Sequence, residues 1–334
     1  MKESGSVFYL LRHALILIFL ISITACEKEE YDLLDRETAG VWSRFNTNSG
    51  LPANQILDIQ RDASGNLWVA FAGNGVGMYQ DGDWSFFNTS NSPIRSNSVT
   101  SLASTSDGGM IIGTTDGVSF RSSSGDWSYY TDPAVTTLSV NSINVLSDGT
   151  YWIGTENEGF YVDLGSGFFQ VYEADYKNVN VIEEDNKGNV FLGTDNGLLK
   201  FDGSEFSLYT VSEGLPDNDI TALFLDSKNR LWIGTNGGAT VAYIDPTGRI
   251  NNLSLMNGDL GTFVTDIFED RRGHIWFATW YDGLIEYDGV VPHSYKIYNG
   301  FYENDINCIG EDKSGNMWFG LYSKGLLKYT LPIE

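Results

Sequence analysis

One motif recurs seven times along the chain, and this repetition constrains the fold more than any other feature. The most complete copy reads DKSGNMWFGLYSKGLLKY and begins at Asp312. Each copy has a large residue at its centre, and these residues are Trp68, Ile111, Trp152, Phe191, Trp232, Trp276 and Trp318. Successive centres lie 39 to 44 residues apart. A period near forty, built from short β-like runs, is typical of a propeller with one four-stranded blade per copy. The sequence therefore predicts an all-β fold, a seven-bladed β-propeller with four antiparallel strands per blade.

Each copy begins with a turn signal and continues into a strand. Asp62 and Gly65 suit the first and fourth positions of a type I turn, and we expect the following Asn66 to adopt the left-handed conformation that closes the hairpin. The next run, LWVA, alternates with period two, so Trp68 and Ala70 share one face of the strand. A large ring beside a small residue lets neighbouring blades approach closely. We therefore assign the large central residues to packing.

The first strand of each blade is expected to be an apolar run beside the central axis. These inner strands are predicted at Ile56–Ile59, Val99–Leu102, Ile143–Leu146, Val179–Ile182, Ile220–Leu223, Val264–Ile267 and Ile306–Ile309. Outer strands are predicted at Trp84–Phe87, Trp127–Tyr130, Phe168–Tyr172, Phe206–Tyr209, Tyr295–Tyr298 and the less aromatic Ile250–Leu255. The last copy stops after its third strand, whereas Val41–Phe45 has outer-strand character and no inner strand before it. We therefore predict that Val41–Phe45 joins the last blade and closes the ring.

The start of the chain resembles the signal sequence of a bacterial lipoprotein. An apolar run from Ala14 to Ile23 is too short to span a bilayer, and it ends in the sequence ITAC at Cys26. This ending resembles a lipobox, and the resemblance implies cleavage before Cys26 and lipid attachment to that residue. We therefore expect a signal peptide at 1–25, a lipidated cysteine with an acidic tether at 26–40, and the propeller at 41–334. An ordinary signal peptide or membrane anchor is the alternative.

The acidic run EKEE follows Cys26 directly. It resembles the export tag that sends some lipoproteins to the outer face of the outer membrane, although a plain solvated tether would have the same composition. We expect the protein in the bacterial cell envelope, held by its lipid, at the outer membrane and facing either the periplasm or the cell surface.

The charge of the chain argues against one class of partner. The net charge is −24, so the protein repels DNA, RNA and anionic lipid surfaces, and we expect no nucleic-acid partner. The composition, 42% hydrophobic and 14% aromatic, is ample for a large core. With Cys26 lipidated, Cys308 stands alone in an apolar strand, where we expect it to act as a small buried hydrophobe. No disulfide is therefore expected.

The repeat resembles the two-component regulator propeller repeat. The resemblance rests on GLPDNDI at Gly214, followed by WIGT at Trp232, and on the second lead-in GLPANQI at Gly50. In that family these repeats form the extracytoplasmic sensing part of hybrid histidine kinases, many of which respond to polysaccharide fragments. The resemblance covers residues 41–330 and implies the propeller fold and a sensing role. We expect a single stand-alone propeller without the kinase part.

Asparagines form the first candidate ligand-binding group, on the face where loops enter the inner strands. They are expected about two residues before those strands, at Asn54, Asn97, Asn141, Asn218 and Asn304. Amides arranged around one channel mouth could hydrogen-bond a polyhydroxylated ligand. The alternative is that each asparagine closes its own loop by a local side-chain-to-backbone bond.

Aromatic residues form the second candidate group, in the loops between second and third strands. Blades six, seven and one become consecutive when the ring closes, and they carry large residues where other blades have small polar ones. The predicted platform consists of Trp280, Tyr281, Tyr322 and Phe71, with Tyr302 nearby from a lead-in loop. Aromatic faces beside amides suit the stacking of a sugar ring. Packing between blades is the alternative role.

Catalytic signals are weak. His274 and His293 are both expected on the opposite face, so we expect no histidine triad or histidine-rich metal cluster on the binding face. The carboxylates expected there are Glu156, Glu158, Asp195, Asp282 and Glu303, and their spacing singles out no glycosidase-type pair. The sequence therefore favours a lipid-anchored, non-catalytic recognition or sensing module for an oligosaccharide or other small ligand, without cofactor or metal. A scaffold for envelope proteins and a polysaccharide hydrolase or lyase are the alternatives.

Overall fold

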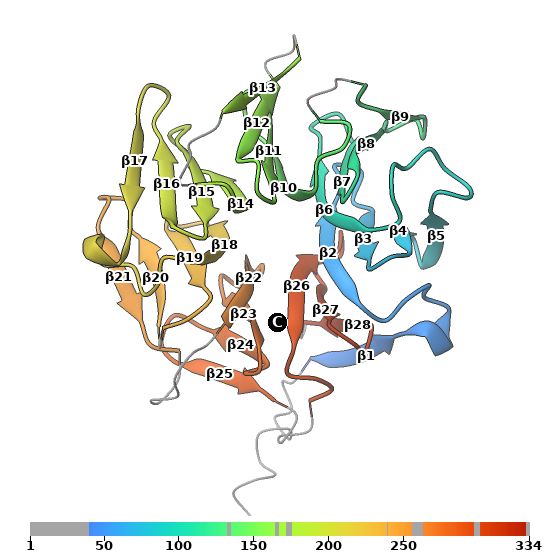
Figure 1. Cartoon of the computed structure of the whole chain (residues 1–334). Coiled ribbons are helices and arrows are strands. Elements are labelled where there is room, and N and C mark those ends of the chain that lie inside the picture. The colour runs from blue at the N-terminus through green and yellow to red at the C-terminus, as the bar shows by residue number, and fades with distance from the viewer. Residues whose placement is uncertain are drawn as a thin grey trace, which may run out of the picture. The chain divides into compact units, whose positions relative to one another are not determined.

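The computed structural model describes residues 40–131, 135–163, 167–171, 176–238, 240–255, 263–296 and 301–331. Within Trp42–Thr330, the described residues form seven four-stranded antiparallel sheets that follow one another around a central axis (Figure 1). The predicted seven-bladed propeller is therefore confirmed. The predicted signal peptide at 1–25 and the lipidation site Cys26 lie outside the described residues. In the part of the chain that is described, no helix is long and apolar enough to cross a membrane.

The blades follow the order of the sequence, and each runs from its inner to its outer strand. Blade one contains β2 (Ile56–Arg61), β3 (Leu67–Phe71), β4 (Gly75–Gln80) and β5 (Asp83–Phe87). Blade two contains β6 (Val99–Ser104), β7 (Met110–Thr114), β8 (Gly117–Arg121) and β9 (Trp127–Tyr129). Blade three contains β10 (Val140–Val145), β11 (Tyr151–Thr155), β12 (Phe160–Asp163) and β13 (Phe168–Val171). Blade four contains β14 (Val179–Glu184), β15 (Val190–Thr194), β16 (Gly197–Phe201) and β17 (Phe206–Tyr209).

The remaining three blades include the one that closes the ring. Blade five contains β18 (Ile220–Leu225), β19 (Leu231–Thr235), β20 (Val241–Ile244) and β21 (Ile250–Leu253). Blade six contains β22 (Phe263–Glu269), β23 (Ile275–Trp280), β24 (Leu284–Tyr287) and β25 (Pro292–Tyr295). Blade seven contains β26 (Ile306–Glu311), β27 (Met317–Leu321), β28 (Leu326–Thr330) and β1 (Val41–Phe45). Two short 3-10 turns, at Thr47–Ser49 and Val211–Glu213, follow β1 and β17.

The ring closes as predicted, because β1 from the start of the chain pairs with β28 from its end. Trp42 of β1 stacks on Tyr329 of β28 with their ring centroids 4.4 Å apart. Its indole also contacts three further aromatic rings, those of Phe301, Phe319 and Tyr295. Closure therefore combines backbone pairing with the packing of an aromatic cluster.

An aspartate in the first hairpin turn organises the centre of four blades. Its carboxylate accepts the indole N–H of the tryptophan six residues later, at 2.8–3.0 Å, in the pairs Asp62–Trp68, Asp226–Trp232, Asp270–Trp276 and Asp312–Trp318. These four indoles are at most 1% exposed. The predicted packing role of the central residues is therefore confirmed, and the turn aspartate supplies the polar partner that a buried indole needs.

The left-handed position in these turns is the fourth residue, which is a glycine in three blades and Asn229 in blade five, and not the residue that follows it. Gly65 has φ 87°. Asn66 instead donates a hydrogen bond from its side-chain amide to the Asp62 carboxylate at 2.9 Å. This bond connects the residue after the turn to the first residue of the turn. The prediction of a left-handed Asn66 is therefore wrong. Cys308, by contrast, is free and buried as predicted.

Two predicted strands are out of place. Val140 lies opposite Thr155, as Val99 lies opposite Thr114 in the preceding blade, so β10 begins three residues before the predicted Ile143. Asn141 therefore belongs to the inner strand itself and not to the loop before it. In blade six the outer strand β25 is Pro292–Tyr295 instead of Tyr295–Tyr298, because Tyr295 pairs with the first residue of β24, Leu284.

Candidate functional site

Three of the predicted aromatic residues lie together where second strands turn into third strands. The ring centroid of Trp280 is 6.0 Å from that of Tyr322 and 6.5 Å from that of Tyr281. On its other side Trp280 lies 4.9 Å from Phe263, the first residue of β22. The indole N–H donates to Asn307 Oδ1 of blade seven at 2.9 Å, which fixes the ring between two blades. We call Phe263, Trp280, Tyr281 and Tyr322 the aromatic rim.

Tyr281 is held in an unfavourable backbone conformation although its side chain is 70% exposed. Its φ is 75°, and its backbone N–H donates to Asp305 Oδ1 at 2.8 Å. At the corresponding position blade one has Gly73 and blade three has Asn157, with φ 67° and 72°. Glycine and asparagine tolerate this region, whereas other residues pay about 1–2 kcal/mol for it. An exposed aromatic residue kept in such a conformation is a candidate for a ligand contact.

The structure places the other two predicted aromatic residues elsewhere. Phe71 is fully buried inside blade one, where it packs against Trp84 and Phe86. The prediction that Phe71 forms part of the ligand surface is therefore wrong, because its side chain points into the apolar interior opposite Ile56. Tyr302 is 39% exposed, and the ring contacts described for it are with Phe301 and with the guanidinium of Arg44.

The predicted asparagines serve the loops in which they stand. The amide oxygens of Asn54, Asn97 and Asn218 each accept a backbone N–H from the preceding turn at 2.8–2.9 Å. The carbonyl oxygen of Asn304 accepts the N–H of Gly283 at 2.9 Å. The three side-chain contacts match the alternative role, in which an asparagine closes its own loop, whereas the Asn304 contact is made by the backbone alone. Ligand binding by the amide groups stays a prediction.

A cavity of about 410 Å³ adjoins the aromatic rim at the ends of the inner strands of blades four, five and six. Its lining consists of Asn178, Asn180, Asp195, Asp219, Thr221, Phe263 and Thr265. Phe263 belongs to both the cavity and the rim, so the two form one continuous surface. Of this lining only Asp195 was singled out from the sequence. The cavity and the adjoining rim form the best candidate for a binding site.

The other carboxylates predicted on this face have partners within the protein. Asp282 forms a salt bridge with Lys296 at 2.9 Å, and both side chains are mostly buried. Glu303 accepts hydrogen bonds from the backbone and hydroxyl of Ser323. Glu158 accepts the hydroxyl of Tyr161 at 3.2 Å. Side chains engaged in this way position the loops and do not form an evident acid–base pair.

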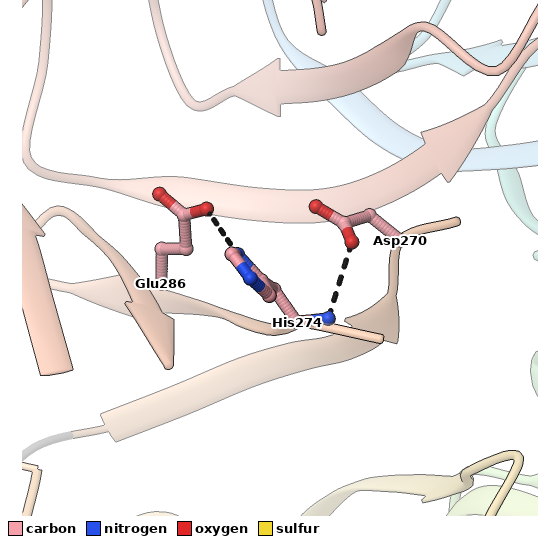
Figure 2. A group of neighbouring side chains, drawn as sticks. All are labelled: Asp270, His274 and Glu286. Atoms are coloured by element: carbon pink, nitrogen blue, oxygen red, sulfur yellow. Dashed lines mark hydrogen bonds and ion pairs between the residues drawn. The ribbon is translucent and has the colours of Figure 1, made fainter. Parts of the chain in front are cut away.

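Asp270 and His274 of the turn between β22 and β23 form a separate group with Glu286 of β24 (Figure 2), and their ligand atoms lie within 4.8 Å of one another. Arg272 donates to both Asp270 and Glu286 at 2.6 Å. Burial acts to raise the pKa of Asp270, but hydrogen bonds from Arg272 and from Trp276 more than offset it and hold that pKa below its ordinary value. The guanidinium bridges the two carboxylates and offsets one of their two charges, so the group forms an ion-pair network.

Three inner-strand carboxylates were not predicted as special. Asp58 of β2 accepts the N–H of Leu102, and Asp266 of β22 accepts the N–H of Ile309, each at 2.7 Å and each from the next blade. Burial raises the pKa of Asp58 to about 6 and that of Asp266 to about 7. Burial also raises the pKa of Glu183 of β14 to about 8, against a hydrogen bond from the Leu225 N–H that lowers it. These carboxylates therefore link neighbouring inner strands while partly protonated near neutral pH.

Comparison with protein families identifies four segments of the chain. The family described as two component regulator propeller matches residues 50–73, 214–237, 258–281 and 303–323. The first segment leads into blade one, and the other three lead into blades five, six and seven. The resemblance noted from the sequence is therefore confirmed. A comparison with curated proteins finds no match.

Solved structures with the same fold come from several kinds of protein. The extracellular domain assigned to a hybrid two component system of B. thetaiotaomicron has a TM-score of 0.72 at 19% identity, covering 87% of this chain and 42% of its own. Streptogramin B lyase has a TM-score of 0.73 at 17% identity, covering 89% of this chain and 100% of its own. PorZ, a surface component of the type-IX secretion system of Porphyromonas gingivalis, has a TM-score of 0.69 at 17% identity, covering 86% of this chain and 47% of its own. The chain thus spans less than half the length of the first and third of these proteins. At such identities the similarity establishes the fold alone.

Proposed function

Because the chain carries two component regulator propeller repeats within a seven-bladed ring, we propose that it is a non-catalytic recognition or sensing module for an oligosaccharide or another small ligand. The ligand binds across the aromatic rim and into the adjoining cavity. The observation that carries this proposal is Tyr281, an exposed aromatic side chain held at φ 75° beside Trp280. Aromatic faces that border a polar cavity suit the apolar face of a sugar ring together with its hydroxyl groups.

The comparisons support an extracytoplasmic role of this kind. The similar structures include extracellular domains assigned to two component systems of B. thetaiotaomicron. A propeller placed outside the cytoplasm can present its rim to ligands in the envelope or beyond it. We propose that this chain works in the cell envelope and is held there by lipid on Cys26.

Replacing Tyr281 with glycine should weaken ligand binding about tenfold or more while leaving the fold nearly as stable. A stacked ring of roughly 60–100 Å² contributes about 1.5–2.5 kcal/mol to binding. Glycine relieves the left-handed strain but adds conformational entropy to the unfolded chain, so the two effects on stability largely cancel. Screening on a glycan array followed by calorimetric titration of the best ligand measures the affinity, and a melting curve measures the stability.

Two further variants serve as controls for this experiment. Tyr322→Ala removes a second ring of the aromatic rim and should also weaken binding, whereas Val290→Ala removes an exposed apolar side chain, 81% accessible, from a loop of blade six at the opposite end of the strands. Unchanged affinity in both rim variants would overturn the proposed binding site. Release of shortened products from the bound glycan would instead identify a hydrolase or lyase.

Replacing Cys26 with alanine should prevent lipid attachment and leave the protein uncleaved or released from the membrane fraction. The reason is that the sequence ITAC at Cys26 resembles a lipobox, whose cysteine sulfur carries the lipid. Fatty-acid labelling with membrane fractionation measures this outcome. Cys308→Ala is the matched control, because that thiol is buried within β26 and should not affect labelling. Continued lipid incorporation in the Cys26 variant would contradict the proposed anchor.

A further inference from the structure

Most hydrogen-bond donors of the side chains that line the cavity are engaged in hydrogen bonds within the protein. Thr221 donates its hydroxyl to the carbonyl oxygen of Val264. Thr265 likewise donates to the carbonyl oxygen of Ile306 at 2.6 Å. A hydroxyl has one donor and two acceptor lone pairs, so what each threonine still offers is an acceptor.

The amides of the lining behave in the same way. Asn180 donates through Nδ2 to the carbonyl oxygen of Ile220 at 3.0 Å and to Asp219 at 3.5 Å. Asn178 donates through Nδ2 to Asp195 at 3.0 Å. Both amide hydrogens of Asn180 are therefore engaged in hydrogen bonds, and so is one of the two amide hydrogens of Asn178. The amides also hold the two carboxylates in place.

The cavity carries negative charge without a compensating cation. Among the described residues, neither Asp195 nor Asp219 forms a salt bridge, and the lining contains no lysine or arginine. Asp219 receives a further hydrogen bond from the side-chain amide of Asn236 at 2.9 Å, which orients its carboxylate without neutralising it. Of the described basic residues on this face, Lys296 is paired with Asp282, whereas Lys177 and Lys324 are exposed in neighbouring loops and do not line the cavity.

The inner strands, three of which end at the cavity, also carry more acidic than basic residues. The seven inner strands that the structure describes carry six acidic residues, Asp58, Glu183, Glu184, Asp266, Glu269 and Glu311, and one basic residue, Arg61. Arg61 stands at the last position of β2 and pairs with Glu311 at 3.2 Å. A positive group that enters from the rim therefore meets the acceptors of the lining and the carboxylates of Asp195 and Asp219.

From the acceptors and carboxylates of the lining we propose that the cavity binds a protonated amine. The ligand of this protein is then an amine-bearing molecule such as an amino sugar. The cavity discriminates against ligands that carry carboxylate or sulfate groups. This inference rests on the proposed binding site and specifies its ligand class. An ammonium group offers three donors and no acceptor, which complements a lining of acceptors. Phe263 adds an aromatic wall that attracts a cation. A neutral hydroxyl would bring acceptor lone pairs that find few donors there, and an anion would find neither donors nor favourable charge.

The test compares oligosaccharides that differ in charge but little in size. The full chain, without its signal peptide, is titrated by calorimetry at about pH 5.5 and low salt with glucosamine tetramer, N-acetylglucosamine tetramer, tetragalacturonate and the sugar-free amine 1,5-diaminopentane. We expect the glucosamine tetramer to bind at least tenfold more tightly than the N-acetylated tetramer and the galacturonate not to bind. Its affinity should fall as salt is added, because the attraction is between opposite charges.

Removal of the two charges provides the matched variants. Asp195→Asn together with Asp219→Asn keeps the shape of the lining and should reduce binding of the glucosamine tetramer at least tenfold, with loss of its salt dependence. Glu205→Gln removes a charge from an exposed position in the turn before β17 and should change little. An unchanged affinity in the double variant would overturn the inference.

The pattern of binding separates this inference from the proposed function. If the N-acetylated tetramer or the galacturonate binds as tightly as the glucosamine tetramer, the amine preference is wrong while glycan recognition stands. If only 1,5-diaminopentane binds, and the double variant abolishes its binding, the amine preference is supported and glycan recognition is wrong. If none of the four binds, both are wrong.

Discussion

Replacing Trp42 with alanine should lower the free energy of unfolding by about 3–5 kcal/mol, the usual cost of truncating a large aromatic residue in a packed cluster. Trp42 stacks on Tyr329 at 4.4 Å and contacts Phe301 at 5.3 Å, Phe319 at 5.6 Å and Tyr295 at 5.7 Å. These contacts join β1 to β28 and to the neighbouring blade six. For a domain of this size the melting temperature should fall by roughly 10 °C.

The strand that carries Trp42 also closes the ring, which gives a second variant. Deleting Val41–Phe45 removes the outer strand of blade seven and leaves β28 as an unpaired edge. Exposed edges template intermolecular pairing, so we expect aggregation in addition to a lower melting temperature. Val41→Ala is the control on the same strand, because Val41 is 65% exposed and its truncation should change stability by less than about 0.5 kcal/mol. A wild-type melting curve for Trp42→Ala would show that closure depends on backbone pairing alone.

The architecture was predictable from the sequence because the information for it is repeated. Seven copies of a turn, a large residue and a small residue two positions later define both the number of blades and the strand period. The role of Val41–Phe45 follows from counting strands. The last copy of the repeat has only three strands, and the beginning of the chain has one additional outer strand. Such inferences depend on pattern and topology, and neither requires knowledge of where individual side chains point.

The errors arise where a single copy departs from the pattern. The sequence predicts that the inner strand of blade three begins at Ile143, whereas the structure begins it at the buried Val140. Asn141 therefore lies within the inner strand and does not belong to the group of loop asparagines. Phe71 is a second error of this kind. Its position at the end of a strand suggests an exposed side chain, but Phe71 pairs opposite Ile56 and its side chain lies in the core. A one-residue difference in strand register moves a side chain to the other face.

The cavity could not be predicted because no segment of the sequence contains it. Its lining is drawn from three blades, and single residues such as Asn180, Thr221 and Thr265 are ordinary strand residues in isolation. Their significance lies in which hydrogen bonds they already make to the next blade. The strained backbone of Tyr281 is likewise visible only in the structure, although an aromatic residue where blade one has Gly73 was a signal that could have been used.

The stability of the propeller should fall as the pH rises from about 5 to about 8, and Glu183 should make the largest single contribution to this fall. Burial raises the pKa of Glu183 from 4.5 to about 8, that of Asp266 from 3.8 to about 7 and that of Asp58 from 3.8 to about 6. The folded state therefore holds these protons to higher pH than the unfolded chain does. Wherever the folded state binds more protons, the free energy of unfolding decreases with increasing pH.

The size of the effect follows from the same linkage. Each pH unit over which one proton is retained only by the folded state changes the free energy of unfolding by about 1.4 kcal/mol, so Glu183 alone contributes on the order of 3–5 kcal/mol. The charged groups that act on Glu183 are Glu184 and Asp266, and both favour its protonated form. Carboxylates with lowered pKa values, such as Asp202 and Asp245 at about 2, lose their stabilising effect only under more acidic conditions.

Glu183→Gln isolates this contribution, because glutamine cannot ionise and retains an oxygen that accepts the Leu225 N–H. Near pH 5 the variant should be about as stable as the wild type, and near pH 8.5 it should be more stable by on the order of 3–5 kcal/mol. Melting temperatures across this pH range measure the difference, with the exposed Glu205→Gln as a control that should follow the wild type throughout. If the wild type instead gains stability between pH 5 and pH 8, Glu183 is ionised in the folded state, and the inner strands must accommodate its charge.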